Sequence, residues 1–430
     1  MIRQVVIIAG GKGTRMGQNS NLAKSLQPIQ NKSILERQCE FFFNNGFKEF
    51  LVLLGEKSGQ IIEEIDKLNL KYEIKIDYLI EEYPIGTGGA LLNALDLLDE
   101  QFILILGDII INTELDSLTK SLDNNNIDFG LFYHPSNHPQ DSDLLKLNSL
   151  QIITDVLTKP RKEGIFRNYG NAGCYVFNKR ILSDLFTGTK DRIKIDLDRE
   201  LIPELIKNGF IGKGVKNIGF IRDCGTPERL RHVNENWSTI ENREFKRPAI
   251  FLDRDGTINK LNGFITNQDQ IEVFAEAPAF ISLMNNLNYW VIVITNQPVV
   301  ARGEVTHEML DSFHAKIEKI VSDGGGIIDD FFYCPHHPDS GFIGEITELK
   351  ISCNCRKPEV GLIQQACERY PIDLNKSWMI GDTWRDAELA SNVGINFISI
   401  NSKNDFSNEF YPASNLMEAA NIIQDSIKMS

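Results

Sequence analysis

The sequence lacks any long apolar run and contains few cysteines for its length. No apolar stretch approaches the roughly 20 residues that a membrane-spanning helix needs, and residues 1–8 lead directly into a strand pattern rather than a secretory signal. The seven cysteines are odd in number and unevenly spread, which fits a reducing compartment better than a disulfide framework. The sequence therefore predicts a cytoplasmic protein that has no membrane partner.

Basic residues are also in deficit. There are 45 Lys and Arg residues against 59 Asp and Glu, which gives a net charge of −14. This excess of acid argues against a nucleic-acid-binding surface. It does not exclude phosphorylated substrates, because bound cations and a few local basic side chains can neutralise those. A length of 430 residues suits two domains, and association into a homo-oligomer stays open.

An apolar run at residues 249–252 ends abruptly in Asp253 and Asp255. Residues i and i+2 of an extended strand point to the same side, so the two carboxylates can converge on one point. Such a pair repels unless a cation or a shared proton relieves it, and Mg²⁺ prefers oxygen ligands. The alternative is an edge strand that runs into an Asx-type turn.

Three later segments favour a catalytic site over that turn. A second apolar run ends in Thr295 and Asn296, whose hydroxyl and amide suit phosphate. Two cations, Arg356 and Lys357, precede an expected helix. A third apolar run ends in further carboxylates, Asp382 and Asp386. Together they could move a phosphoryl group through an aspartyl-phosphate. Over roughly residues 247–400, this order and spacing resemble the haloacid dehalogenase superfamily of phosphatases.

The resemblance implies a role for each of these side chains. Asp253 is the expected nucleophile, and Asp255 the general acid/base, whose pKa we expect to be raised. Lys357 would offset the developing charge. The expected phosphate ligands are Thr295 and Asn296, and the expected Mg²⁺ ligands are Asp253, Asp255 and Asp382. Asp386 is either a further residue of this site or an exposed helix acid.

A separate set of soft ligands lies between the phosphate-binding strand and Lys357. Its members are Cys334, His336, Cys353 and Cys355. Three thiolates and an imidazole match a closed, structural Zn²⁺ site, and residues 338–351 have too few apolar side chains to form a core of their own. A disulfide is the weaker alternative. This arrangement resembles the small uncapped subgroup that contains heptose-1,7-bisphosphate 7-phosphatases and histidinol-phosphate phosphatases, which implies that Arg356 contacts the distal end of the substrate.

In the first half, an apolar strand at residues 5–9 runs into a glycine-rich turn. This turn contains Gly11, Gly13, Thr14 and Arg15. Glycines let backbone N–H groups approach a phosphate closely, and an arginine can add a bidentate contact. The turn is neither a dinucleotide fingerprint nor a Walker A loop, and on its own it could be an ordinary strand-to-helix connection.

Later segments favour nucleotide binding. Lys24 supplies a cation, and Gly86 and Gly88 belong to a second turn of small residues. Further residues lie at or near the ends of apolar strands: Asp108, Asn171, Gly173 and Asp223. Strands that alternate with helices predict a doubly wound sheet with its ligands at the strand carboxyl ends. Asp108 and Asp223 both lie at such ends and can share a cation, which nucleotidyl transfer requires.

Over roughly residues 1–232 this set resembles the sugar-1-phosphate nucleotidyltransferases. The resemblance implies that the Gly11–Arg15 loop and Lys24 hold a nucleoside triphosphate, and that Gly86 and Gly88 lie beside the base and ribose. The implied sugar ligands are Asn171, Gly173 and Lys159, and the implied Mg²⁺ ligands are Asp108 and Asp223. The sequence departs from the family pattern at three positions, Ala23, Thr158 and Cys224.

The predicted architecture is α/β, with two doubly wound Rossmann-like domains: a nucleotidyltransferase at 1–236 and an uncapped haloacid dehalogenase-like phosphatase with a zinc loop at 247–430. By resemblance, two such domains imply consecutive steps, in which heptose 1,7-bisphosphate loses its 7-phosphate and the heptose 1-phosphate receives GMP from GTP. The alternatives are an ADP, CDP or UDP product, a different small-phosphate phosphatase, or a sugar-nucleotide sensor with one inactive domain.

Overall fold

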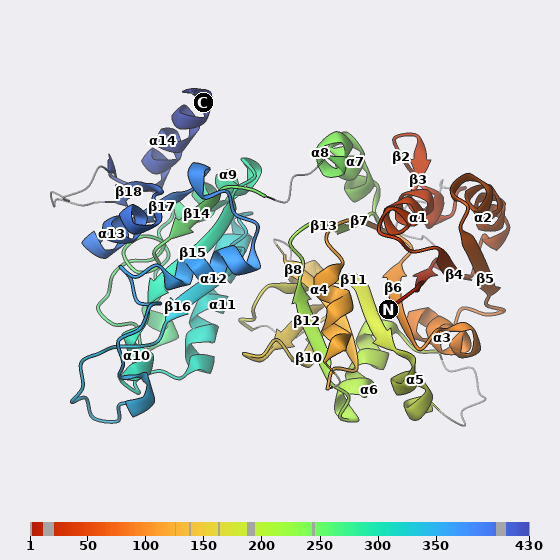
Figure 1. The fold of residues 1–430 in the computed structure, drawn as a ribbon, viewed down its shortest axis with the longest axis horizontal. Coiled ribbons are helices and arrows are strands. Elements are labelled where there is room, and N and C mark those ends of the chain that lie inside the picture. Colours follow the sequence, from red (N-terminus) through yellow and green to blue (C-terminus); the bar gives the residue numbers. More distant parts are fainter. Residues whose placement is uncertain are drawn as a thin grey trace. The chain divides into compact units, whose positions relative to one another are not determined.

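The computed structural model describes residues 2–11, 21–124, 126–136, 139–161, 164–186, 194–242, 246–400 and 410–429. The chain divides into two compact units, each an α/β sheet flanked by helices (Figure 1). One unit comprises residues 1–134, 142–161 and 169–243, and the other comprises 135–141, 162–168 and 244–430. Within the described ranges, no helix combines the length and the apolar character needed to cross a bilayer.

The first unit is organised on a nine-stranded sheet, whose main path runs β10-β9-β11-β6-β1-β4-β5. The four strands from β6 to β5 are parallel and β11 pairs antiparallel with β6; β8 and β12 lie off this path. The strand bounds are β1 Gln4–Ile8, β4 Glu49–Leu54, β5 Lys75–Ile80, β6 Gln101–Leu106, β8 Phe129–Pro135, β9 Leu144–Leu147, β10 Ile153–Leu157, β11 Tyr169–Asn178 and β12 Gly212–Lys216. The short pairs β2 Pro28–Ile29 with β3 Lys32–Ser33, and β7 Ile109–Asn112 with β13 Phe220–Asp223, lie outside this sheet.

Helices cover both faces of this sheet. They are α1 Ile34–Asn44, α2 Ser58–Tyr72, α3 Gly86–Asn93, α4 Asp116–Thr119, α5 Lys179–Phe186, α6 Ile202–Lys207, α7 Pro227–Glu235 and α8 Trp237–Glu241. The central strands β1, β4 and β6 are apolar at every position after the first, because both of their faces are covered. The last two helices belong to the first unit, where the Arg37 guanidinium lies 4.1 Å from the centre of the Trp237 ring. Residues 237–241, just beyond the predicted bound at residue 236, are therefore helical.

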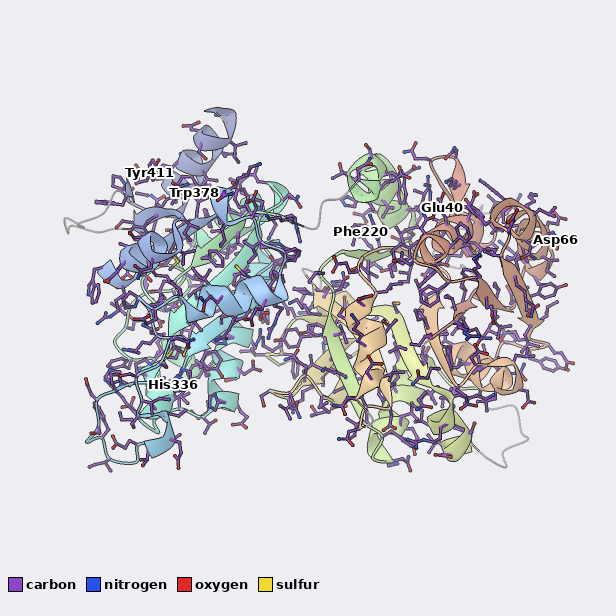
Figure 2. All side chains as sticks on the ribbon, in the orientation of Figure 1. Glu40, Asp66, Phe220, His336, Trp378 and Tyr411 are labelled. Atoms are coloured by element: carbon purple, nitrogen blue, oxygen red, sulfur yellow. The ribbon has the colours of Figure 1, made fainter. Side chains whose placement is uncertain are left out.

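The second unit has one fully parallel sheet in the order β16-β15-β14-β17-β18-β19. Its strands are β14 Ala249–Leu252, β15 Trp290–Asn296, β16 Asp330–Cys334, β17 Trp378–Gly381, β18 Asn396–Ile400 and β19 Tyr411–Ala413. Its helices are α9 Ala277–Asn286, α10 Pro298–Ala301, α11 His307–Asp323, α12 Gly361–Arg369, α13 Trp384–Val393 and α14 Leu416–Met429. Trp378 and Tyr411, labelled in Figure 2, pack edge to face with ring centroids 5.4 Å apart. The prediction of two doubly wound domains is confirmed.

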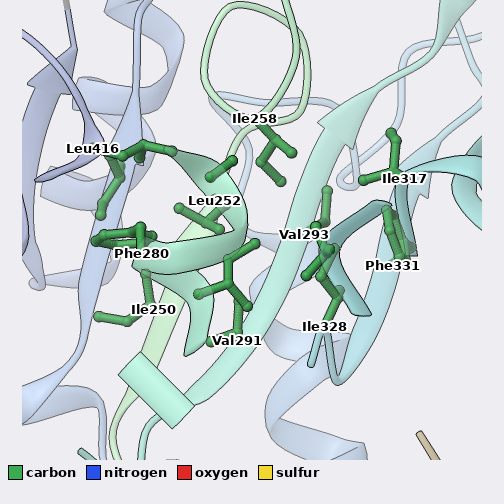
Figure 3. Packing of buried hydrophobic residues seen from close by; sticks show 14 of the residues in the cluster. Ile250, Leu252, Ile258, Phe280, Val291, Val293, Ile317, Ile328, Phe331 and Leu416 are labelled. Atoms are coloured by element: carbon green, nitrogen blue, oxygen red, sulfur yellow. The ribbon is translucent and has the colours of Figure 1, made fainter. Parts of the chain in front are cut away.

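The core of the second unit forms where alternate side chains of β14 and β15 meet α9. Ile250 and Leu252 point to the same side as Val291 and Val293, and all four are fully buried with Phe280 (Figure 3). Because the strands are parallel, this packing brings the carboxyl ends of β14, β15 and β17 to the same edge of the sheet. Functional side chains placed directly after these strands therefore lie close together.

Truncation of Phe280 tests whether the two cores are separate. Phe280→Ala is expected to lower the free energy of unfolding of the second unit by about 3–5 kcal/mol, because it leaves a cavity in a fully packed core. Denaturant unfolding followed by tryptophan fluorescence checks this, since Trp290, Trp378 and Trp384 all lie in this unit.

The matched control is Phe102→Ala, at an equally buried ring in the first unit. It should leave the tryptophan-detected transition of the second unit in place. A single transition shifted equally by both substitutions would contradict separate cores.

Candidate functional site

Three neighbouring strands deliver the expected phosphatase residues to one edge of the second sheet. Asp253 follows β14, Thr295 and Asn296 end β15, and Asp382 follows β17. β14 pairs with both β15 and β17, so the three strand ends are adjacent. Thr295 is 1% exposed and its hydroxyl accepts a hydrogen bond from Gln297 Nε2 at 2.9 Å. The structure brings these predicted residues together.

Lys357 reaches this edge from a turn more than sixty residues further along the chain. Its Nζ lies 2.8 Å from Asp253 Oδ1 and 2.6 Å from Asp386 Oδ1, and donates to the carbonyl oxygen of Ile294 at 2.9 Å. The backbone of Lys357 exchanges two hydrogen bonds with the Asn296 side chain, at 2.9 and 3.1 Å. The ammonium is therefore buried and held beside the expected nucleophile.

Asp253, Asp382 and Asp386 form a carboxylate group that could hold a metal ion. Asp386 is fully buried, so the alternative of an exposed helix acid is wrong. Burial raises the pKa of Asp253 to about 7 and that of Asp382 to about 6, and the buried Oδ1 of Asp382 has no hydrogen-bond partner. These features fit a divalent cation, which would satisfy the orphaned oxygen and favour the charged carboxylates.

Gly256 allows this close packing. Its φ is +90°, and a Cβ placed there would lie 2.2 Å from Asp382 Oδ2. Any other residue at position 256 would both strain the backbone and displace the Asp382 carboxylate. The glycine of the Asp-Gly pair is thus required by the geometry of the carboxylate group.

The Asp255 carboxylate does not join that group. It accepts hydrogen bonds from Arg254 Nη2 at 2.8 Å, Gln297 Nε2 at 2.9 Å and Asn259 Nδ2 at 2.9 Å. Burial acts to raise its pKa, but the charge of Arg254 and these hydrogen bonds outweigh burial and lower it. The expectation of a raised pKa is therefore wrong for the protein as it stands.

Sequence reasoning missed the side chains that hold Asp255. Arg254 is 1% exposed, and its Nη2 also donates to Gln297 Oε1 at 2.9 Å. An arginine between two aspartates reads as a surface residue in an alternating strand pattern, which is why it gave no signal. Its hydrogen bonds to Asp255 and Gln297 hold it inward instead.

The four expected zinc ligands converge. His336, labelled in Figure 2, comes from the turn after β16. Cys334 Sγ lies 3.5 Å from Cys353 Sγ, Cys355 Sγ lies 3.3 Å from Cys353 Sγ, and His336 Nδ1 lies 3.2 Å from Cys355 Sγ. Zinc–sulfur bonds of about 2.3 Å in a tetrahedron separate the sulfurs by roughly 3.8 Å, whereas a disulfide requires about 2.05 Å. These cysteines are free, and the spacing fits a bound Zn²⁺.

In the first unit, Asp108 and Asp223 meet beside Lys24. The Nζ of Lys24 forms an ion pair with Asp108. β13 pairs antiparallel with β7 so that Asp223 lies opposite Ile109. Arg229, which sequence reasoning missed, contacts both oxygens of Asp223 at 2.6 and 2.7 Å and contributes to the lowered pKa of that carboxyl. Two carboxylates and two cations therefore lie close together, and such a group could bind Mg²⁺ and phosphate oxygens.

The expected sugar contact Asn171 is held by a residue that the sequence did not reveal. Its Nδ2 donates to Asp198 Oδ1 at 2.8 Å, and Tyr175 Oη donates to the same oxygen at 2.6 Å. Burial is the main cause that raises the pKa of Asp198 to about 7. The side chain of Asn171 also accepts from the backbone of Gly173 at 2.9 Å, so the two predicted residues act as one turn.

The structure places some of the remaining predicted residues of the first unit, and others lie outside the described residues. Gly86 and Gly88 open α3 and pack on Ile195, where a Cβ on Gly86 would lie 2.5 Å from the Ile195 carbonyl oxygen. Lys159 donates its backbone N–H to Asp143 Oδ1 at 2.9 Å, and Gly11 is exposed. Gly13, Thr14 and Arg15 lie outside the described residues. Cys224, one of the positions that depart from the family pattern, is fully buried.

The two groups of carboxylates and cations, one in each unit, indicate an enzyme that acts on phosphate groups at two sites. A family profile described as nucleotidyl transferase matches residues 4–239, and one described as HAD-hydrolase-like matches residues 354–407. The chain belongs to the nucleotidyl transferase family, and its second unit belongs with the haloacid dehalogenase-like heptose bisphosphate phosphatases. It is thus a nucleotidyltransferase joined to a phosphatase.

Curated relatives place the second unit in that phosphatase group. The chain is 36% identical over 149 residues to the D-glycero-beta-D-manno-heptose-1,7-bisphosphate 7-phosphatase of Yersinia pestis, covering 34% of this chain and 77% of the relative. It is 34% identical over 150 residues to the enzyme of the same name from Rhodopseudomonas palustris, covering 35% of this chain and 81% of the relative.

Solved structures resemble each unit. HddC from Yersinia pseudotuberculosis complexed with GMP-PN is 26% identical, with a TM-score of 0.45, and the match covers 55% of this chain and 100% of that one. The D,D-heptose 1.7-bisphosphate phosphatase from B. bronchiseptica, complexed with magnesium and phosphate, is also 26% identical, with a TM-score of 0.37, and the match covers 42% of this chain and 99% of that one.

Removing the charge of Asp253 tests its role as nucleophile. Asp253→Asn keeps the shape of the side chain, so phosphatase turnover should fall about a thousandfold or more while the fold persists. Phosphate release under saturating substrate measures this. Asp269→Asn, an exposed acid of the same unit, should keep full activity, and substantial turnover by Asp253→Asn would remove Asp253 from the role.

Loss of a zinc ligand should disable the phosphatase selectively. Cys355 precedes Lys357 by two residues, so disorder in the metal loop would misplace the buried ammonium. Cys353→Ser should lose one equivalent of zinc and most phosphatase activity, while pyrophosphate release from supplied sugar 1-phosphate persists. Metal analysis and the two assays check this, with Cys367→Ser in α12 as the control. Full phosphatase activity in zinc-free protein would contradict it.

Proposed function

We propose that the enzyme removes the 7-phosphate of D-glycero-D-manno-heptose 1,7-bisphosphate and then transfers a nucleotidyl group to the resulting heptose 1-phosphate. The observation that carries the proposal is the convergence of Asp253, Lys357 and Asp386 at the strand edge that also presents Thr295. The curated relatives of this unit are named for the same bisphosphate. The substrates are small sugar phosphates and a nucleoside triphosphate.

In the first reaction, a carboxylate oxygen of Asp253 attacks the phosphorus at position 7, and the bond from that phosphorus to the sugar oxygen breaks. The sugar oxygen takes a proton from Asp255, whose lowered pKa rises when the phosphate dianion arrives beside it. Asp255 then accepts a proton from water, which attacks the aspartyl-phosphate and releases phosphate. Lys357, Thr295 and Asn296 hold the phosphoryl oxygens.

Mg²⁺ at Asp253 and Asp382 would neutralise charge on the transferring group. The Asp386 carboxylate lies on the same buried ammonium as Asp253, so it fixes the position of Lys357. Zn²⁺ at Cys334, His336, Cys353 and Cys355 would take no part in the chemistry, because four protein ligands close its coordination shell.

In the second reaction, an oxygen of the sugar 1-phosphate attacks the α-phosphorus of the nucleoside triphosphate, and pyrophosphate leaves. Lys24 and the Gly11–Arg15 loop would hold the triphosphate, and Asp108 and Asp223 would hold the Mg²⁺ that lowers repulsion between the two phosphates. Asn171, Gly173 and Lys159 would contact the sugar, and Gly86 and Gly88 the nucleoside. No bond to the anomeric carbon changes, so the bisphosphate and the product share one anomer.

GTP is the favoured nucleotide, with GDP-D-glycero-α-D-manno-heptose as product. The curated relatives are named for the beta anomer of the bisphosphate, so the anomer and the base are the two points that experiment must separate. Because the anomer is retained, one substrate panel can decide both.

The test combines each anomer of the bisphosphate with Mg²⁺ and each of four nucleoside triphosphates, and records phosphate, pyrophosphate and sugar nucleotide. The proposal predicts one equivalent each of phosphate and pyrophosphate, and GDP-heptose from the alpha anomer. Asp253→Asn should block the sequence unless heptose 1-phosphate is supplied, and Asp108→Ala should stop it at heptose 1-phosphate. Phosphate release without sugar nucleotide under every condition would contradict the proposal.

A further inference from the structure

The second unit includes a short internal segment of the first half of the chain. Residues 162–168 belong to this unit, although the chain before them, to Arg161, and after them, from Tyr169, belongs to the first unit. Two expected sugar ligands flank this inserted segment, since Lys159 lies three residues before it and Asn171 three residues after it. A segment that the second unit holds therefore separates, along the chain, two residues that would bind the sugar 1-phosphate.

Arg167 attaches the inserted segment to α11 of the second unit. Its guanidinium donates two parallel hydrogen bonds to Glu318, from Nε to Oε2 at 2.9 Å and from Nη2 to Oε1 at 2.8 Å. A third bond runs from Nη1 to Asp311 Oδ1 at 2.5 Å. The side chains of Arg167 and Glu318 are only 11% and 5% exposed. A bidentate pair with so little access to water fixes both the position and the orientation of the arginine.

The backbone beside Arg167 is held by the same helix. The N–H of Asn168, a buried residue, donates to Glu318 Oε2 at 3.1 Å. The guanidinium carbon of Arg167 lies 5.2 Å from the centre of the Phe331 ring, and Phe331 belongs to β16, which is at one end of the second sheet. Arg167 therefore covers an apolar ring of an edge strand. The attachment reaches the last residue before β11, which begins at Tyr169.

The start of β11 is the part of that strand that carries the expected sugar ligands. The pairing of β11 with the central strand β6 begins at Cys174, so Asn171 precedes it. Gly170 pairs with β9, and the N–H of Asn171 donates to the carbonyl oxygen of Asp143 at 3.1 Å. The side chain of Asp143 also accepts the N–H of Lys159 at 2.9 Å, which links the two expected ligands. Movement at residue 168 would therefore shift Asn171 first and Lys159 through Asp143.

We propose that Arg167 is a positioning residue for nucleotidyl transfer, because its ion pair with Glu318 fixes the start of β11 and thereby Asn171. The inference rests on the proposed transfer to a sugar 1-phosphate, and it adds that a helix of the phosphatase unit sets the affinity of the transferase for that substrate. Arg167 acts through residues 168–170 and touches no substrate. Lys24, the expected triphosphate ligand, precedes α1 and is remote in sequence, so binding of the nucleoside triphosphate should not depend on Arg167.

The test measures kcat and KM of Arg167→Gln by pyrophosphate release, with heptose 1-phosphate or mannose 1-phosphate supplied directly together with Mg²⁺ and each nucleoside triphosphate. A misplaced Asn171 should raise KM for the preferred sugar 1-phosphate about tenfold, the value of one lost hydrogen bond. KM for the nucleoside triphosphate and kcat/KM of the phosphatase should each change by less than about twofold. Arg167→Lys should recover only part of the loss, because it keeps the charge but not the planar fork.

Further variants separate this role from a structural one. Arg167→Gln leaves Glu318 buried without its partner, so the double variant Arg167→Gln, Glu318→Gln removes both charges and keeps the test valid if the single variant does not fold. It should show the same rise in KM, because both variants break one contact. Arg180→Gln is the control, since Arg180 is an exposed arginine of α5 that pairs with Asp128 at 3.2 Å, and it should keep the parent KM. Equal rises in KM for both substrates, or the parent KM in the double variant, would overturn the inference.

Hydrogen exchange of the peptide that covers residues 169–174 gives a second readout, which needs no substrate. Both variants should speed exchange at the start of β11 about tenfold, while the central strand β6 keeps its protection. If the parent protein converts no sugar 1-phosphate, the proposed transfer fails, whereas faster exchange in this peptide still supports the attachment through Arg167. If the parent protein converts heptose 1-phosphate but exchange in the variants is unchanged, the proposed transfer stands and the Arg167 inference is overturned.

Discussion

The second site depends on one buried ammonium. Lys357 Nζ bridges Asp253 and Asp386 and also donates to a backbone carbonyl of β15, so one side chain ties together the ends of two strands and the first turn of α13. A buried cation between two carboxylates is stable only while all three partners stay in place. Arg254 makes an analogous contact with Asp255. The site is thus a set of fixed charges whose positions depend on one another.

A group of cysteines and a histidine stands directly before Lys357, where a bound metal would stabilise this arrangement of charges. The segment from 338 to 351 contributes few residues to the buried core, so a metal held by Cys334, His336, Cys353 and Cys355 would order it instead. Order imposed at Cys355 is transmitted to Lys357 over two residues of backbone. The same segment carries Ile346, whose N–H donates to the Ala301 carbonyl oxygen of α10 at 3.0 Å, so it connects the turn before Lys357 with the helix that follows β15.

Much of this could be predicted from sequence because parallel sheets place their functional residues at strand ends. Apolar runs that stop at Asp253, Thr295 and Asp382 predicted both the strands and the site. What the sequence could not reveal depends on side-chain direction: Arg254 turns inward to lower the pKa of Asp255, and Asp198 reaches Asn171 from a π-helical segment 27 residues away. Neither contact follows from periodicity, since each depends on how separate segments pack.

The central claim is that the phosphate at position 7 passes through Asp253 before the sugar is activated. The most direct test uses heptose 1,7-bisphosphate labelled in that phosphate, with Mg²⁺ and GTP, quenched in acid at millisecond intervals. The account predicts that label appears transiently on the peptide that contains Asp253, then entirely as inorganic phosphate, with none in the sugar nucleotide. Label retained in the sugar nucleotide, or released without ever residing on that peptide, would contradict it.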